Sequence, residues 1–391
     1  MKVKLKDVCT FYTGTGFPKQ YQGQLSGTYP FYKVGDIANN VVSGKIYLEQ
    51  CNNYISEETL ELIKGSIVPK NTVVFAKIGE ALKLNRRAIT STDCLIDNNA
   101  MGIAAKSDKL RTLFFYYFMR NIKMELLAES TTVPSVRKSR LEAYEIDIPS
   151  LDEQEIIERK LTILSKIINL KEKQLLKLDE LVKARFVEMF GDPVLNDKSW
   201  RVIKLGKLCS KICSGNTPKG GSDNYTKEGI MFFRSQNVWK NRLELDDIVY
   251  IDEATHEKMK ETSLNYGDIL ITKTGRINTE NSSLGRSALF LGKNDSANIN
   301  GHVYLVRINS ELVNRHFVLQ ILISPQYRDL IRRVCVGGID KRQLNQNHIY
   351  DFPIIIPPLE FQNQFASFVQ EIDKSRLLSN HSLSLIKFIT F

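Results

Sequence analysis

Residues 146–161 read "IDIPSLDEQEIIERKL", and a similar stretch, "IIIPPLEFQNQFASFV", returns at residues 354–369. Each copy joins a short apolar strand, a proline stop and the polar first turn of a helix, and Gln154 of the first copy falls on Gln362 of the second. Because one chain of 391 residues builds this junction twice, we expect it to contain two copies of one module.

Further matches extend the duplication over most of the chain. The segment "KLKDVC" at 4–9 matches "KLGKLC" at 204–209, and residues 54–79 match residues 250–275 in a longer alignment. The offset between the copies drifts from about 196 to 208, as loops of different length require. Each copy therefore has about 150 residues of mixed structure, followed by one helix.

The expected fold class is α+β. Strand signals within each copy are short β-branched or aromatic runs, such as "TVVFAKI" at 72–78 and "DILITKT" at 268–274. Helical stretches such as "TLFFYYFMRNIKMELLAE" at 112–129 lie between the strands. We expect two similar globular domains that alternate with two long helices, in four segments with the bounds 1–151, 152–191, 192–359 and 360–391.

The first helical segment has the pattern of a coiled coil. Ser150, with Glu153 three residues later, forms a capping box that starts a helix, and the next helix breaker is Gly191. About 39 residues at 1.5 Å each give a helix of about 58 Å, which needs a partner helix along its length. Its narrow apolar seam steps by four and three residues, with Lys171 as an interruption. The seam consists of Ile157, Leu161, Leu164, Ile168, Leu175, Leu178 and Val182.

The second helical segment carries a poorer version of the same seam. Its apolar positions are interrupted by Arg376 and Ser379. We expect the two helices to pair as an antiparallel coiled coil with a pseudo-two-fold axis and one domain at each end; the alternative is two independent surface helices. The seam positions of the second helix are Phe365, Val369, Ile372, Leu383 and Ile386.

The excess of positive charge lies in the two globular segments. The chain carries 54 Lys and Arg against 44 Asp and Glu, a net charge of +10. Residues 1–151 and residues 192–359 account for +5 each, whereas both helical segments are neutral. This balance is expected if both domains touch a polyanion such as nucleic acid, although proteins that touch none also carry mildly basic surfaces.

The sequence lacks the patterns of an enzyme. A methyltransferase would show a Gly-rich cofactor loop and an Asn/Asp-Pro-Pro-aromatic step, and neither is present. The loop "GNTPKGGS" at 215–222 has Gly221 where a phosphate-binding loop needs lysine, so we interpret it as a turn. The five histidines show no HxxxH or HExxH spacing, and we find no nuclease cluster. We therefore expect no catalytic residue and no bound metal or cofactor.

The cysteines and the apolar runs point to the cytoplasm. Of six cysteines, only Cys209 and Cys213 are close enough to share a helix face, and a structural zinc needs four ligands, so we expect reduced thiols. No apolar run approaches the roughly 20 residues that span a bilayer, and the Met1 end lacks the apolar core of a signal peptide. We expect a cytoplasmic protein that contacts no membrane.

This order of parts resembles the specificity subunit of Type I restriction–modification enzymes. Two α+β domains alternate with two repeated helices, and each helix is entered through a Pro-(Ser/Pro)-Leu step. The end of the first helix, "ARFVEMFGDP" at 184–193, is also similar to that family's exit into its second domain. The resemblance covers essentially the whole chain.

The resemblance implies a non-catalytic DNA-binding subunit of a methyltransferase and endonuclease complex. Each globular domain would be a target recognition domain that binds one half of an asymmetric bipartite sequence in double-stranded DNA. The helix pair would set the spacing between the half-sites and dock two modification subunits. The modification subunits would bring S-adenosylmethionine, and the motor-nuclease restriction subunits would join the complex through them. A two-fold arrangement of the readers also fits half-sites about one helical turn apart on a duplex.

Loops that combine Arg or Lys with Asn or Gln are the candidates for DNA contact, because cations hold phosphates and amides read base edges. Equivalence across the repeat is the main argument, since Lys77 matches Lys273 and Lys138 matches Lys341. The alternative for each single residue is a solvated surface charge. The candidates in the first domain are Lys77, Lys83, Asn85, Arg86, Arg87, Arg137, Lys138 and Arg140. Those in the second domain are Arg234, Gln236, Asn237, Lys273, Arg276, Asn278, Lys341, Arg342 and Gln343.

Two other functions remain open at this point. A stand-alone bipartite DNA-binding regulator would need no partner subunits, and co-elution with modification subunits would exclude it. A coiled-coil scaffold whose basic domains bind protein or RNA would be separated from a DNA reader by competition between duplex DNA and single-stranded RNA.

Overall fold

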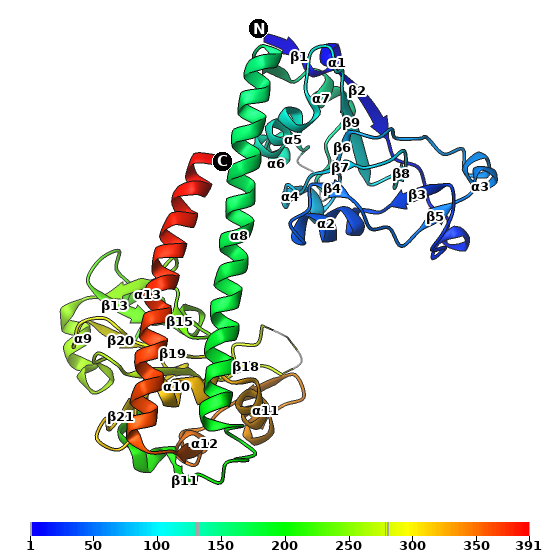
Figure 1. Cartoon of the computed structure of the whole chain (residues 1–391). Helices are drawn as coiled ribbons and strands as arrows, with labels where there is room; N and C mark the ends of the chain where they lie inside the picture. Colours follow the sequence, from blue (N-terminus) through cyan, green and yellow to red (C-terminus); the bar gives the residue numbers. More distant parts are fainter. Residues whose placement is uncertain (1, 130–132, 278, 280, 391) are drawn as a thin grey trace. The chain divides into compact units, whose positions relative to one another are not determined.

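The chain folds into two compact units (Figure 1). The computed structural model describes residues 2–129, 133–277, 279 and 281–390, with side chains up to residue 386. Unit 1 comprises residues 1–173 and 381–391, and unit 2 comprises residues 174–380. Each unit holds one mixed domain together with parts of both long helices, so we call the globular part of unit 1 domain 1 and that of unit 2 domain 2.

Domain 1 is built on a five-stranded sheet with the strand order β2-β9-β6-β7-β4. The interior strand β6, with the sequence TVVFA, is buried at every position, and it pairs antiparallel with β9 and β7. A strand buried on both faces needs such a continuous apolar run. The bounds are β2 Cys9–Thr13, β4 Tyr47–Leu48, β6 Thr72–Ala76, β7 Ala88–Thr90 and β9 Ala100–Ala105.

Smaller elements complete domain 1. A three-stranded sheet has the order β5-β3-β8, in which β3 is antiparallel to β5 and parallel to β8. The remaining strands are β1 Lys2–Lys4, β3 Tyr29–Tyr32, β5 Tyr54–Ile55, β8 Leu95–Ile96 and β10 Glu145–Asp147. The helices are α1 Leu5–Val8, η1 Lys19–Tyr21, α2 Val34–Val42, α3 Glu57–Leu62, α4 Glu80–Lys83, α5 Thr112–Asn121, α6 Met124–Leu127 and α7 Lys138–Glu142.

Domain 2 repeats this frame. Its main sheet has the order β12-β21-β17-β19, and a second sheet, β16-β13-β20, again combines one antiparallel and one parallel pairing. The predicted duplication of an α+β domain is therefore confirmed at the level of sheet topology. The bounds are β12 Cys209–Ser214, β13 Ile230–Phe233, β16 Val249–Ile251, β17 Ile269–Thr272, β19 Ser287–Leu289, β20 Ala297–Ile299 and β21 Val303–Ile308.

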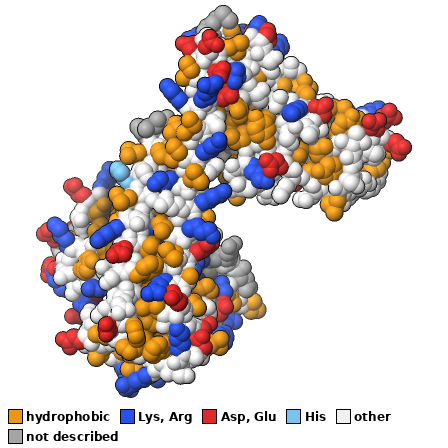
Figure 2. Space-filling view, viewed as in Figure 1, with side chains coloured by type: hydrophobic (Ala, Val, Ile, Leu, Met, Phe, Trp, Pro, Cys, Tyr) orange, Lys and Arg blue, Asp and Glu red, His pale blue; other side chains and the backbone are white. Residues whose placement is uncertain are grey.

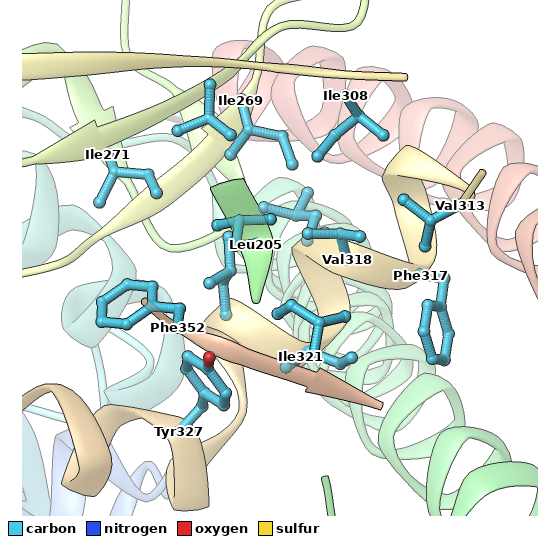
Figure 3. Packing of buried hydrophobic residues seen from close by; sticks show 14 of the residues in the cluster. Leu205, Ile269, Ile271, Ile308, Val313, Phe317, Val318, Ile321, Tyr327 and Phe352 are labelled. Carbon is cyan, nitrogen blue, oxygen red and sulfur yellow. The ribbon is translucent and has the colours of Figure 1, made fainter. Parts of the chain in front are cut away.

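Other elements of domain 2 border the sheets. The strands are β11 Arg201–Lys204, β14 Val238–Trp239, β15 Arg242–Leu243, β18 Thr274–Arg276, β22 Val336–Gly337, β23 Lys341–Gln343 and β24 Pro353–Ile356. The helices are η2 Leu205–Leu208, η3 Gly221–Asn224, η4 Ser235–Asn237, α9 Glu253–Lys258, η5 Lys260–Thr262, α10 Arg315–Ile323, α11 Pro325–Val334 and α12 Gln346–Tyr350. Figure 3 shows Phe317 and Ile321 of α10 and Tyr327 of α11 among the buried residues of one core, which also includes Ile269 and Ile271 of β17.

The two long helices begin directly after a strand and a proline. Helix α8, Leu151–Phe190, has 40 residues, and α13, Leu359–Thr390, has 32. The amide of Ser150 donates to the carboxylate of Glu153 at 2.9 Å, and the amide of Glu153 donates to the Ser150 hydroxyl at 3.3 Å. The predicted capping box is therefore confirmed.

The long helices pack antiparallel within unit 2. The Phe365 ring near the start of α13 lies 5.5 Å from the ring of Phe186 and 5.7 Å from that of Phe190, both near the end of α8. Further along α13, Arg376 forms an ion pair with Asp179, an earlier residue of α8. The predicted seam residues in this cluster are Leu178, Val182, Phe365, Val369 and Ile372.

The structure corrects two details of the predicted seam. Ile157 and Leu161 pack against the core of domain 1, because the first turns of α8 lie on their own domain. Ser379, predicted as an interruption, is buried, and Arg376 is held by acidic side chains of both helices. The remaining predicted seam residues are buried or half-buried: Leu164, Ile168, Leu175, Leu383 and Ile386.

The described residues include no helix that is both long and apolar enough to cross a membrane. All six cysteines are free thiols. Burial raises the pKa of Cys9 to about 12, since a thiolate would lose its hydration there. The prediction of reduced, partly buried thiols agrees with these positions.

Candidate nucleic-acid interface

The same backbone position holds a lysine in both domains. Lys77 follows the interior strand β6, and Lys273 follows the interior strand β17. In domain 1 the amide of Lys77 donates to the Asn99 carbonyl, and the Lys77 carbonyl accepts from the amide of Val136, both at 2.9 Å. These bonds fix the lysine where the end of the strand meets two loops.

Lys273 repeats this arrangement in domain 2. Its amide donates to the His302 carbonyl at 2.9 Å, and its carbonyl accepts from the Leu344 amide at 2.8 Å. The ammonium lies 4.6 Å from the centroid of the Tyr304 ring and donates to the Ser214 hydroxyl. Burial lowers the pKa of Lys273, because the ammonium has lost part of its hydration. Such a cation gains more from a nearby phosphate than a fully hydrated one.

Four of the candidates in domain 2 lie on one short strand ladder, β18–β23, which follows Lys273 in the chain. Strand β18 pairs antiparallel with β23, so that Arg276 lies opposite Lys341. Arg342 and Gln343 follow Lys341 on the same strand. Lys341 and Gln343 are exposed, whereas Arg342 is half-buried. Four predicted contact residues therefore lie side by side.

Domain 1 has a shorter counterpart of this ladder. Ile78, directly after Lys77, bridges to Ser135 in antiparallel pairing. This pairing brings Lys77 close to the segment that enters α7. Three predicted cations follow in that segment: Arg137, Lys138 and Arg140. The Arg137 side chain is 70% exposed and forms an ion pair with Glu129 at 2.8 Å.

A cation stacked on an aromatic pair lies at the end of β3. The ammonium of Lys33 is 5.5 Å from the centroid of the Phe17 ring, which stacks on Phe31 at 3.8 Å. Our reading of the sequence missed Lys33 and Phe17. The match of "FYKVGDI" to "FFRSQNV" was the available signal, because it aligns Lys33 with Arg234.

Domain 2 repeats this feature with Arg234. The guanidinium carbon of Arg234 lies 5.9 Å from the centroid of the Tyr225 ring and forms an ion pair with Asp247 at 3.0 Å. Gln236 also donates to the Asp247 carboxylate, at 2.7 Å. The hydrogen bond from Gln236 and the charge of Arg234 lower the pKa of Asp247. Two predicted residues, Arg234 and Gln236, thus share one carboxylate at the surface.

Arg87 was wrongly assigned to DNA contact, and the half-buried Asn85 holds its side chain in place. The side chain of Arg87 is 2% exposed, lies 4.8 Å from the centroid of the Phe75 ring and donates to the Asn85 side chain at 2.6 Å. The Asn85 amide donates in turn to the Arg120 carbonyl at 2.8 Å. Burial lowers the pKa of Arg87 to about 9. Both side chains support the fold of domain 1, while the neighbouring Arg86 is half-buried.

The assignment of Asn237 is also corrected. Its side chain is 1% exposed, accepts from the Arg234 amide at 2.9 Å and donates to the Glu244 carbonyl at 3.1 Å. Asn237 therefore shapes the loop that carries Arg234. Lys83 is exposed and pairs with Glu80 at 2.7 Å. Asn278 lies outside the described residues.

Domain 2 also contains a hairpin, β14–β15, that the sequence reasoning missed. Strands β14 and β15 carry Trp239 and Arg242, and the guanidinium carbons of the buried Arg286 and of Arg242 lie 3.9 and 5.5 Å from the Trp239 ring centroid. The Nε group of Arg286 donates to the Ser282 carbonyl at 3.1 Å. Arg286 thereby joins the hairpin to the loop after β18. The only early signal was a tryptophan beside two cations in "VWKNR".

Among the described residues, His256, Glu257 and Asp295 are the one group with metal-ligand spacing. The Asp295 carboxylate already accepts hydrogen bonds from Lys260 and Ser263. These bonds, Lys260 first, lower the pKa of Asp295 to about 2. Because the Lys260 ammonium already donates to the Asp295 carboxylate, the three residues form a hydrogen-bonded cluster and would make a poor site for a metal ion.

Comparisons with known proteins agree with this architecture. The family model described as "Type I restriction modification DNA specificity domain" matches residues 1–180 and 197–387. Two curated relatives from Methanocaldococcus jannaschii are the Type I restriction enzyme MjaIX specificity subunit, 23% identical over 99% of this chain and 89% of that protein, and the MjaVIII specificity subunit, 20% identical over 95% and 85%. A match to the putative MjaX specificity subunit spans 45% of this chain and 40% of that protein, at 23% identity.

Solved structures share the fold. The S subunit of a Type I restriction-modification system from M. genitalium has a TM-score of 0.59 at 14% identity, over 100% of this chain and 93% of that one. A chain from a study of complex assembly and conformational transition of the type I R-M system has a TM-score of 0.57 at 17% identity, over 100% and 95%. Together with the matching frame of the two domains, the family match shows that this chain belongs to the Type I restriction modification DNA specificity family, whose members are non-catalytic specificity subunits.

Proposed function

We propose that each domain reads one half of an asymmetric bipartite target in double-stranded DNA. The observation that carries this proposal is the lysine at one backbone position in both domains, Lys77 and Lys273, with different side chains around it. A repeated cation suits a phosphate, which every target shares, and the differing neighbours suit base edges, which vary. Unlike neighbours in the two domains predict unlike half-sites.

The long helices are proposed to dock two modification subunits. Ile156, Ile163 and Leu170 stand seven residues apart on α8 and are 54%, 58% and 66% exposed. Seven-residue spacing places them on one face of the helix, and such an exposed apolar row suits a protein partner. On the face drawn in Figure 2, hydrophobic side chains alternate with Lys and Arg along the long helices.

The remaining partners follow from this assignment. The modification subunits would bind S-adenosylmethionine, and the restriction subunits would join through them, so this chain would hold no cofactor itself. A complex that reads chromosomal DNA in this way would work in the cytoplasm. The second candidate, a stand-alone bipartite regulator, needs no partner. Co-elution of the purified chain with modification subunits decides between the two.

The test of DNA reading is the double variant Lys273→Ala with Arg276→Ala in the full chain. The target is first identified by mapping methylated sites in cells with and without this chain, where loss of a split motif is expected. Losing two phosphate contacts should weaken duplex binding and lower the salt slope by about two. The matched control is Lys204→Ala, which removes an exposed cation of the same unit that is paired with Asp351. An unchanged affinity across salt would remove this ladder from the interface.

A further inference from the structure

A buried glutamine ties the start of α8 to domain 1. The side chain of Gln154 is 0% exposed. Its carbonyl oxygen accepts a hydrogen bond from the amide of Arg111 at 2.9 Å. Its side-chain amide donates to the carbonyls of Lys109 and Pro149, each at 3.0 Å. Because Arg111 is the N-cap of α5, one side chain joins the spacer helix, the end of the preceding segment and a helix of the domain.

Gln362 forms the same clamp at the start of α13. It is also 0% exposed, and its carbonyl oxygen accepts from the amide of Asn314 at 2.9 Å. Its side-chain amide donates to the carbonyl of Pro357 at 2.8 Å. Asn314 is the N-cap of α10, the helix that corresponds to α5 in domain 2. Two independent copies of the clamp therefore connect equivalent elements in the two units.

These clamps lie at the short joint between each domain and its long helix. Only three residues separate β10 from α8, and two separate β24 from α13, so each helix leaves its domain through a short proline link. Gln154 satisfies three backbone groups and Gln362 satisfies two, and breaking either clamp is costly because each buried partner would be left without a hydrogen bond. The glutamine thus fixes one angle between domain and helix.

We propose that Gln154 and Gln362 are positioning residues that set the orientation of each recognition domain on its spacer helix, and through it the gap between the two DNA half-sites. This inference rests on the proposed function. A domain of about 150 residues has a radius of gyration of roughly 15 Å, so a tilt of roughly 10° moves its surface by roughly 3 Å. Base pairs are about 3.4 Å apart, so a tilt of this size equals one step of the gap.

The experiment measures gap discrimination by the full chain, with its modification subunits if binding requires them. The probes are duplexes that carry both mapped half-sites at the native gap and at gaps one base pair shorter and longer, and duplexes with one half-site. The variant is Gln362→Met, which keeps the volume of the side chain and removes its hydrogen bonds. The matched control is Gln364→Met, since Gln364 is exposed on the same turn of α13.

Wild type and Gln364→Met should lose about tenfold in affinity for each altered gap, a loss similar to that of a mismatched base pair. Gln362→Met should bind all three gaps within about threefold of one another, with unchanged affinity for one half-site. Full gap discrimination in a folded Gln362→Met variant would overturn the inference. So would a loss of half-site binding, because the residue would then serve the fold of the domain alone.

Two further results distinguish a failure of the proposed role of the glutamines from a failure of the proposed function. If Gln362→Met does not fold, Gln154→Met receives the same test in unit 1, and failure of both variants to fold would also overturn the inference. If wild type itself binds all gaps equally, the proposed bipartite recognition is wrong. Gap discrimination by wild type together with unchanged discrimination by both variants would reject the clamps and leave the proposed function intact.

Discussion

The two domains share their sheet topology and differ in the segments that follow equivalent strands. After the equivalent cations Lys33 and Arg234, domain 1 continues as helix α2, whereas domain 2 continues through a short 3-10 turn into the β14–β15 hairpin. In each domain a single loop, 97–99 or 300–302, hydrogen-bonds both to the residue before this cation and to the amide of the repeated lysine. The comparison indicates that backbone pairing preserves the position of the two lysines proposed to hold phosphates, while the segments that follow Lys33 and Arg234 differ in shape.

The first turns of the two long helices also occupy equivalent positions and make different contacts. In unit 2, Phe365 packs between aromatic rings of α8 and is fully buried. At the corresponding position of unit 1 stands Ile157, which is half-buried, and the Arg111 guanidinium binds Glu158 at 3.0 Å nearby. The joint of unit 2 is therefore stabilised by a fully buried aromatic cluster, whereas that of unit 1 combines half-buried apolar packing with an ion pair.

The largest effect on the free energy of unfolding is expected when the two joints are compared by the variants Phe365→Ala and Ile157→Ala. Removing a fully buried ring should cost about 3–5 kcal/mol, whereas the half-exposed Ile157 should cost about 1–2 kcal/mol. Both tryptophans of the chain lie in unit 2, so their fluorescence during urea unfolding reports that unit. Phe365→Ala should shift the fluorescence transition, and Ile157→Ala should shift only the part of the far-UV signal that comes from unit 1.

Phe361→Ala is the control for this pair, because Phe361 is 46% exposed on the same helix. Its unfolding midpoint should stay close to that of wild type. Equal shifts from Phe365→Ala and Ile157→Ala would contradict the difference between the two joints.

An effect of intermediate size should separate two neighbouring arginines of domain 1. Under the proposed function, Arg86→Ala should lower the salt slope of DNA binding by about one, because it would remove a phosphate contact. Arg87→Met should leave DNA affinity within about twofold of wild type, since the Arg87 guanidinium is buried over Phe75. Binding measured at several salt concentrations tests both. A loss with Arg87→Met as large as that with Arg86→Ala would return Arg87 to the DNA interface.

The smallest expected effect is a change of stability with pH, at a turn beside the sheet where the two domains differ. In domain 2 this turn holds Asp295, bound by Lys260 and Ser263, whereas the corresponding part of domain 1 pairs the buried residues Val68 and Cys94. The pKa of Asp295 is lowered to about 2, below the ordinary value near 3.9, so its carboxylate stabilises the fold above that value. The stabilisation should disappear as the pH falls toward 2.

Asp295→Asn should therefore cost about 0.2–1 kcal/mol at pH 7, because the group is nearly half exposed, and less at pH 3. Denaturant unfolding followed by tryptophan fluorescence at both pH values measures the difference. Asp246→Asn, at an exposed position of the same domain, serves as the control. A difference between wild type and Asp295→Asn that grows on acidification would contradict a lowered pKa of Asp295 in the folded protein.

Sequence reasoning reached the parts of the molecule that depend on local pattern. The repeat, the capping box at Ser150 and the alignment of Lys77 with Lys273 could be read from spacing, because backbone pairing preserves them. The burial of Arg87 could not, since "LNRRA" has the composition of an exposed loop and only the packing of Phe75 covers it. Ile157 also fits the spacing of the coiled-coil seam, yet it packs against the core of domain 1, which the spacing could not show.

The glutamine joints bind only main-chain groups on the side of the domain: the amides of Arg111 and Asn314 and the carbonyls of Lys109, Pro149 and Pro357. No side chain of the domain has to match the glutamine. Substitutions in a domain that keep these main-chain positions therefore leave the hydrogen bonds of the glutamine in place. Under the proposed function, a domain of different sequence but the same backbone would meet the helix through the same peptide groups and carry its own half-site preference.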